Sequence, residues 1–173
     1  RVGGRWGDLL PSIPEGQNYL FHSERGEGKP IFKWRSRYWS FLLKLSKNRP
    51  SWTIQAQPGS AIGPFHWNNR RLTMREMARI QTFPDHVEVL GGVSEVQKQI
   101  GNAVPSAIGE LLGREIRRQF FGEKITSANL SLVPKPAPKP ARPTKVYPVA
   151  KEYINLRVKP SSRAETEEPS ASL

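Results

Sequence analysis

The stretch RRLTMREMARIQTFPD, at positions 70–85, contains the clearest local structural signal in the sequence. Thr73 and Glu76 stand at the spacing of a capping box, in which each side chain accepts a hydrogen bond from the other residue's backbone N–H. Pro84 cannot continue a helix, and the residue before a proline is pushed toward extended backbone. This stretch therefore predicts a short, well-capped helix over residues 73–82.

A second helix is predicted downstream, close to the string QIGNAVP at positions 99–105. Beyond this string, apolar residues recur every three or four positions and form one stripe: Ile108, Leu111, Leu112, Ile116 and Phe120. Nothing else in the chain is large enough to cover the stripe, so we expect a helix over about residues 103–120 with an exposed apolar face. Such a face indicates packing against a larger body.

The first 70 residues predict a small, irregular, strand-containing region. Gly, Pro and Asn interrupt its short apolar runs, which favours short strands joined by loops. Residues 18–22, 30–34 and 52–56 are the clearest strand candidates, and residues 38–45 suggest a short helix.

A change of composition near residues 122–133 indicates the start of a tail. The string PKPAPKPARP, at positions 134–143, predicts extended backbone of polyproline type. Residues 146–158 form a modest apolar patch that predicts either a short strand or a docking segment, and residues 161–173 have a disordered composition. We therefore expect residues 122–173 to be a Pro/Lys-rich, mostly disordered tail.

The composition limits the kinds of protein this chain can be. Its net charge is +12 and most of the excess lies in residues 1–128, which suggests a nucleic-acid partner, although a solvated basic surface gives the same balance. No cysteine is present, which excludes a disulfide scaffold and a Cys-ligated zinc site. No stretch of about 18 apolar residues could span a membrane, so we expect a cytoplasmic chain. A start at Arg1, with no signal peptide, predicts a fragment or a processed chain.

The two motif stretches together resemble one known family. Residues 70–85 closely resemble the ninth conserved motif of the DNA cytosine-5 methyltransferases, and residues 99–105 resemble the tenth and last motif. Upstream, RPSWTI at 49–54 resembles the Pro-Ser-x-Thr element of the family's target-recognition region. Residues 1–105 are also similar to one bacterial branch, so the resemblance covers residues 1 to about 121.

The resemblance implies a fold and an activity. Residues 1–70 would be the target-recognition region, and residues 71–121 would return to a doubly wound α/β domain that binds the cofactor, which makes the chain an α+β fragment with a disordered tail. The family transfers a methyl group from S-adenosylmethionine to carbon 5 of a flipped-out DNA cytosine, after attack by a Cys thiolate. With no Cys and no glycine-rich cofactor turn, the chain holds no catalytic residue, and we predict that it is inactive alone.

The resemblance also implies roles for individual residues, and it predicts no metal site. An incomplete cofactor pocket would be lined by Asn102, Ala103 and Val104. Contacts to double-stranded DNA are expected from Arg35, Arg37, Lys44, Arg49 and Thr53. The recognition region would be ordered by three structural organisers: Arg75, Glu76 and Arg79.

Three tryptophans have two readings. The recognition region is expected to contact the major groove, where each base pair shows a distinct pattern, through side chains of residues 34–39 and 63–70. Trp34 and Trp39 lie in the first of these stretches, and Trp52 lies in the Pro-Ser-x-Thr element. Core packing in a small domain is the interpretation that we favour for all three.

Three hypotheses remain open at the level of sequence. The chain is the C-terminal part of a truncated methyltransferase, or a non-catalytic DNA-recognition subunit of a split one, or a basic nucleic-acid-binding module unrelated to methylation. The paired motifs argue against the third. Under the first two, its partners are DNA and a missing N-terminal catalytic part or subunit, in a restriction-modification context and in association with the nucleoid.

Overall fold

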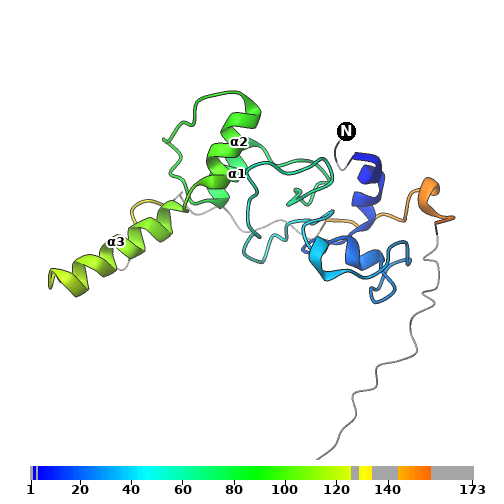
Figure 1. Ribbon diagram of the computed structural model, residues 1–173, viewed down its shortest axis with the longest axis horizontal. Helices are drawn as coiled ribbons and strands as arrows, with labels where there is room; N and C mark the ends of the chain where they lie inside the picture. Colours follow the sequence, from blue (N-terminus) through cyan, green and yellow to red (C-terminus); the bar gives the residue numbers. More distant parts are fainter. Residues whose placement is uncertain (1, 3, 126–128, 134–143, 157–173) are drawn as a thin grey trace, which may run out of the picture.

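The computed structural model describes residues 2, 4–125, 129–133 and 144–156 of the chain. These residues form three α-helices: α1 (Met74–Ile80), α2 (Val93–Asn102) and α3 (Ser106–Phe120). They also form four short 3₁₀ helices: η1 (Gly4–Ser12), η2 (Tyr19–His22), η3 (Ser36–Tyr38) and η4 (Lys151–Tyr153). Helices α1 and α2 pack against each other, whereas α3 extends away from the rest of the molecule (Figure 1).

The expected strands do not form among the described residues. Only isolated bridges pair the backbone there: Ser23 with Phe32, Phe41 with Ile62, Lys44 with Phe65, and His66 with Arg70. Residues 19–22, expected within a strand, form η2, and the Asn18 side chain caps it by accepting a hydrogen bond from the Leu20 N–H at 3.0 Å. The prediction of strands is therefore wrong, since each apolar run is too short and too interrupted to build a ladder.

The helix expected over residues 38–45 is also absent, apart from η3 at its start. Leu42 lies within this stretch with a φ of 51°, in the left-handed region that a right-handed helix cannot include. Its side chain is nevertheless fully buried. Packing of this leucine therefore determines the local backbone here, against its helix propensity.

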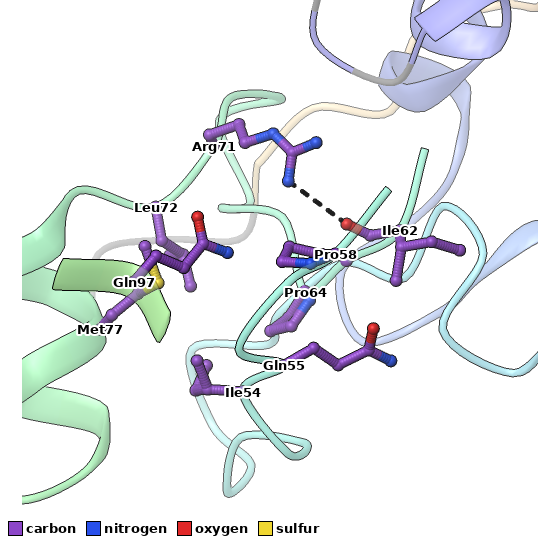
Figure 2. A pocket seen from close by; sticks show the side chains of 10 residues that line it. Ile54, Gln55, Pro58, Ile62, Pro64, Arg71, Leu72, Met77 and Gln97 are labelled. Carbon is purple, nitrogen blue, oxygen red and sulfur yellow. Dashed lines mark hydrogen bonds between the residues drawn. The ribbon is translucent and has the colours of Figure 1, made fainter. Parts of the chain in front are cut away.

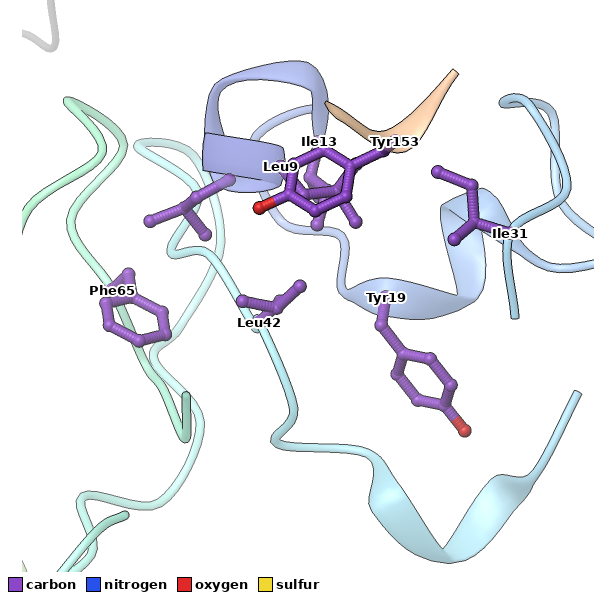
Figure 3. Packing of buried hydrophobic residues seen from close by; sticks show 8 residues of the cluster. Leu9, Ile13, Tyr19, Ile31, Leu42, Phe65 and Tyr153 are labelled. Atoms are coloured by element: carbon purple, nitrogen blue, oxygen red, sulfur yellow. The ribbon is translucent and has the colours of Figure 1, made fainter. Parts of the chain in front are cut away.

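The first hydrophobic core lies in the N-terminal part of the chain (Figure 3). Its buried members are Leu9, Leu10, Ile13, Tyr19, Ile31, Leu42, Phe65 and Tyr153. Tyr153 comes from far along the chain, yet it is only 5% exposed, stacks on Trp6 with ring centroids 5.8 Å apart, and donates a hydrogen bond to the Arg5 carbonyl at 2.9 Å. The first core therefore joins the beginning of the chain to its last described segment.

Residues 144–156 dock on the first core and form no strand. The Tyr147 N–H donates to the Pro11 carbonyl at 3.1 Å, and the Thr144 N–H donates to the Glu15 carboxylate at 2.7 Å. Of the two alternatives expected for residues 146–158, the described part is therefore a docking segment, and Tyr153 is its buried anchor. The predicted polyproline stretch 134–143 and the disordered end 161–173 lie outside the described residues.

The second hydrophobic core lies between α1, α2 and the loops before them. Its buried members are Leu45, Ile54, Leu72, Met77, Val96 and Ile100. Two of these precede residue 70 and four follow it. The expected division of the chain at residue 70 is therefore not a division in packing, because one core joins both sides.

The capping box expected at the start of α1 is confirmed. The Glu76 N–H donates to Thr73 Oγ1 at 3.2 Å, and the Thr73 N–H donates to Glu76 Oε2 at 2.8 Å. The helix begins at Met74 and ends at Ile80, within the predicted span.

Helix α2 was not expected, and α3 begins later than predicted. Residues 93–102, which include the first part of the QIGNAVP string, form α2, while Pro105 stands immediately before α3. A signal for α2 exists in the spacing of Val93, Val96 and Ile100, and in Glu95, whose Oε2 accepts the Gly92 N–H at 2.9 Å. This signal was weak because Gly92 offers no side-chain cap.

The exposed apolar stripe on α3 is confirmed. Its five residues, from Ile108 to Phe120, are between 48% and 77% exposed, and α3 buries none of its described side chains. The helix is held at one side by Glu110, whose carboxylate accepts the backbone N–H groups of Ser131 and Leu132 at 2.8 and 2.7 Å. In the part of the chain that the structure describes, no helix is long and apolar enough to cross a membrane.

Candidate functional site

Glu76 connects the start of α1 to the loop before it. Its two carboxylate oxygens accept hydrogen bonds from the Arg70 guanidinium at 2.7 and 2.8 Å, in addition to the Thr73 N–H. The hydrogen bonds from Arg70 lower the pKa of Glu76 to about 2, against a smaller opposing effect of burial. Sequence reasoning missed Arg70, because it lies outside the helix and no periodic spacing relates it to Glu76.

Arg75 and Arg79 share one acceptor, Asp85. Arg79 forms a bidentate pair with its carboxylate at 2.9 and 2.6 Å, and Arg75 lies 3.1 Å from the same group. The pair is well exposed, so its effect on stability is small, but a bidentate geometry fixes direction. The structure therefore brings the expected organisers together around α1 and places the chain after Pro84 beside that helix.

The end of α1 binds the end of α2 through Gln81. Its side-chain amide donates to the Ile100 carbonyl at 3.0 Å and the Ala103 carbonyl at 3.4 Å, on either side of Asn102. Thr82 continues the same connection toward α3. We call this region, residues 81–82 with 100–107, the motif joint.

Thr82 has an unusual backbone conformation that α3 uses. Its φ is 58°, a value that β-branched residues rarely adopt. In this conformation Thr82 Oγ1 accepts the Ala107 N–H at 2.9 Å, and the Thr82 carbonyl accepts the Ser106 hydroxyl. Because Pro105 provides no side-chain cap, Thr82 supplies the acceptor that the first turn of α3 needs.

The three residues expected to line a cofactor pocket lie at the surface of the motif joint. Asn102 ends α2 and is exposed, Ala103 is half-buried, and the Val104 side chain is also exposed. The site thus presents one amide and one apolar side chain to the outside of this chain. Such a surface can form one wall of a pocket whose other walls come from elsewhere.

Four of the five residues expected to contact DNA are exposed. Arg35, Arg37 and Arg49 lie at the surface, as does Thr53, whose neighbour Ile54 is buried in the second core. Because Ile54 packs into the second core, the side chain of its neighbour Thr53 is directed outward, as the expected DNA contact requires.

Lys44 differs from this expectation. Its side chain is 2% exposed, and its Nζ donates to the carbonyls of Leu10 and Ile13 at 3.2 and 2.6 Å. Burial lowers its pKa to about 8, with a smaller opposing effect from Glu15. Lys44 is therefore a core cation that satisfies backbone carbonyls, and its ammonium is not available to DNA.

The three tryptophans expected in the core are exposed instead. Trp34, Trp39 and Trp52 are 39%, 43% and 49% exposed, so the core interpretation is wrong. Trp39 and Trp52 contact each other edge to face, with ring centroids 5.3 Å apart, and the Arg25 guanidinium lies 4.5 Å from the Trp34 ring. Exposed indoles beside arginines are typical of binding surfaces, because they offer large contact areas with little loss of side-chain entropy.

A small cavity lies between the Trp52–Ala56 segment and α1 (Figure 2). Its volume is about 20 Å³, which is room for about one water molecule. Figure 2 shows Arg71 at its edge, where the guanidinium donates to the Ile62 carbonyl at 3.5 Å. This cavity is a packing feature, far too small for a nucleoside or a cofactor.

Comparisons with known proteins agree on one family. The family model described as C-5 cytosine-specific DNA methylase matches residues 12–118. The chain is 48% identical over 129 residues to the type II methyltransferase M.SacI of Streptomyces achromogenes, covering 69% of this chain and 33% of that protein.

More distant relatives include bacterial and plant proteins. The type II methyltransferase M.NgoFVII of Neisseria gonorrhoeae is 37% identical over 98 residues, covering 56% of this chain and 25% of that protein. DNA (cytosine-5)-methyltransferase 1B of Oryza sativa subsp. japonica is 36% identical over 87 residues, covering 49% of this chain and 6% of that protein. The chain spans a third or less of each of these relatives. No solved structure gives a significant match.

Proposed function

The chain belongs to the C-5 cytosine-specific DNA methylase family, and from this premise we propose that it provides the target-recognition part of a DNA cytosine-5 methyltransferase and one wall of its cofactor pocket. Methyl transfer would require the remainder of the enzyme, since the chain covers only a third of the relative from Streptomyces achromogenes. We expect that remainder to contain the doubly wound α/β domain. Its surface would cover the exposed stripe of α3.

The motif joint is the observation that supports this proposal most directly. Gln81 fixes the turn around Asn102 by bonding the carbonyls of Ile100 and Ala103. On the other side of α2, Ile100 and Ile54 share the second core. Asn102, proposed to face the cofactor, thus ends the helix whose Ile100 packs in one core with Ile54, the neighbour of Thr53.

The residues of the cofactor wall fit a nucleoside-containing ligand in their chemistry. The Asn102 amide can bond a polar edge, and the Val104 side chain offers apolar contact to a ring face. S-adenosylmethionine, when bound, supplies the methyl group. The role of this chain would be to bind and orient the cofactor from one side.

The exposed cations and indoles of residues 25–53 are proposed to contact duplex DNA. Arg35, Arg37 and Arg49 would bind phosphates or guanine edges, and the Thr53 hydroxyl would donate to the backbone. Trp39 and Trp52 would add apolar contact beside them. These contacts position the duplex and select its sequence, whereas the covalent step needs a thiolate that this chain does not contain.

Reconstitution tests the proposed function. We expect no transfer of labelled methyl groups from S-adenosylmethionine to DNA by this chain alone, and measurable transfer after co-expression with the N-terminal two-thirds of the Streptomyces achromogenes relative. Methyl incorporation by the Cys-free chain alone would overturn the proposal. So would a reconstituted complex that assembles and binds DNA but transfers nothing.

Two further measurements separate the two proposed surfaces. The chain alone should bind duplex DNA weakly, with a strong dependence on salt and little sequence preference. In the reconstituted enzyme, Asn102→Ala should raise the Kd for the cofactor about tenfold, with DNA affinity in the absence of cofactor much less affected. Unchanged cofactor binding would remove Asn102 from the proposed wall.

Family membership sets aside the hypothesis of a basic module unrelated to methylation. The two remaining arrangements are a truncated enzyme and the recognition subunit of a split enzyme. They differ in the gene immediately upstream. A continuous reading frame with the catalytic motifs indicates the former, and a separate frame indicates the latter.

A further inference from the structure

The segment Trp52–Ala56 is placed by packing and not by a hydrogen-bonded ladder. Among the described residues, no backbone-to-backbone hydrogen bond involves this segment. Three side chains attach it instead: Ile54 is buried in the second core, Trp52 contacts Trp39, and the Gln55 amide donates to the Ser40 hydroxyl at 3.2 Å. Its position therefore depends on the surfaces against which it lies.

Helix α2 approaches this segment through a glycine. A Cβ built on Gly101 would lie 2.5 Å from both the Cα and the N of Ala56, and 2.8 Å from the carbonyl carbon of Gln55. Real Cβ atoms do not come this close to backbone, so only glycine permits the contact. A backbone neighbour cannot rotate away as the end of a flexible side chain would.

We infer that Gly101 is a positioning residue for the DNA-contacting segment Trp52–Ala56, whose role in DNA contact rests on the proposed function above. Gly101 acts through this segment and needs no contact with DNA. It sets how closely α2 and the segment approach, and hence where Trp52 and the Thr53 hydroxyl lie. Any side chain at position 101 would press on the backbone of the segment and push the segment outward.

A substitution at Gly101 changes the helix propensity of α2 as well as its close approach to the segment. Alanine is more favourable than glycine inside a helix by about 1 kcal/mol, and Gly101 lies in the last turn of α2. Gly109 in α3 is a matched contrast, because a Cβ there would meet nothing within 4 Å. Comparing Gly101→Ala with Gly109→Ala therefore separates the effect of close approach from the effect of helix propensity.

The first experiment measures the position of the segment without DNA. The whole chain is labelled with 5-fluorotryptophan, which gives one fluorine resonance for each of its five tryptophans, and Trp52→Phe assigns the resonance of Trp52. Gly101→Ala should shift the Trp52 resonance and leave that of Trp6, in the first core, unchanged. Gly109→Ala should shift neither. An unmoved Trp52 resonance in folded Gly101→Ala would overturn the inference.

A milder variant covers the case in which Gly101→Ala does not fold. Ile54→Val removes one methyl group from the anchor of the same segment and should leave the fold intact. We expect it to shift the Trp52 resonance as well. No shift in this variant would show that packing on α2 does not place the segment.

The second experiment asks whether this placement matters for DNA. Affinity for a mixed-sequence DNA duplex is measured at low salt with Gly101→Ala, in the wild type and in a Thr53→Ala background. Loss of one displaced polar contact should weaken binding about fivefold in the wild type, and much less when Thr53 is already absent. Equal losses of DNA affinity in both backgrounds would show that Gly101 does not act through this segment. If the wild type binds no DNA while Trp52 still shifts, the proposed DNA role fails and the placement by Gly101 stands.

Discussion

The motif joint and the first core are held together by contacts of opposite kinds. In the joint, polar side chains satisfy backbone groups at helix ends, and the partners Thr82 and Ala107 are 25 residues apart. In the first core, apolar side chains from both ends of the described chain meet, and the hydrogen bond between Tyr153 and Arg5 joins residues 148 apart. Polar contacts at helix ends therefore determine the first region, whereas apolar packing over a much longer stretch of chain determines the second.

The largest effect is expected from removing the long-range anchor. Tyr153→Ala should lower the free energy of unfolding by about 3 kcal/mol, because it leaves a cavity among buried side chains. Tyr147→Ala is the matched control, since this side chain is 49% exposed, and it should cost far less. Urea denaturation of both variants measures the difference. Equal losses would contradict the view that the first core depends on residue 153.

The next effect concerns charge at the start of α1. Glu76→Gln should lower stability by roughly 1–2 kcal/mol at pH 7, because Gln preserves much of the capping box but loses the ion pair with Arg70. The folded pKa of about 2 lies below the ordinary value of 4.5. This contribution is therefore fully present above pH 4.5 and is lost as the pH falls toward 2.

Stability measured against pH checks this expectation. The stability curves of the wild type and Glu76→Gln should converge in acid. A constant gap between the two curves down to pH 2 would mean that the carboxylate charge is not responsible.

A smaller effect is expected at Thr82. Thr82→Ala retains the positive φ and loses the cap on α3, whereas Thr82→Gly loses the cap but removes the steric cost of that φ. Glycine should therefore be more stable than alanine here by about 1 kcal/mol, the reverse of their order in a helix. Thermal unfolding of the two variants, with Gly109→Ala as a helical reference, decides the sign.

The smallest effect is expected from the exposed pair at the end of α1. Arg79→Gln should lower the stability only slightly in low salt, and the difference should fade as salt is added. A larger loss of stability that persists at high salt would show that the ion pair with Asp85 holds the chain after α1 more strongly than its exposure indicates.

Features that depend on nearby residues could be predicted from the sequence. The capping box of Thr73 and Glu76 is complete within four residues, and the stripe of α3 follows one helical period. The exposure of that stripe also followed, since no element among the described residues is large enough to cover it. In each case the physical cause lies within a few turns of the residues concerned.

Features that depend on distant partners could not be predicted. Lys44 was expected at the surface, and only the fold reveals that the carbonyls of Leu10 and Ile13 surround its ammonium. The exposure of Trp39 and Trp52 likewise depends on which other side chains fill the two cores. The close approach of Gly101 to Ala56 left no local signal, because a glycine in a helix has the same appearance whether or not another backbone lies against it.

The burial of Tyr153 has a consequence for the order of events during synthesis. Among the described residues, the second core contains none beyond Ile100, so it can close while the rest of the chain is still being made. The first core begins with Leu9 but cannot be completed until residue 153 has left the ribosome. The first core, which begins earlier in this chain than the second, is therefore completed later. Until then, its apolar side chains are available to chaperones and to aggregation.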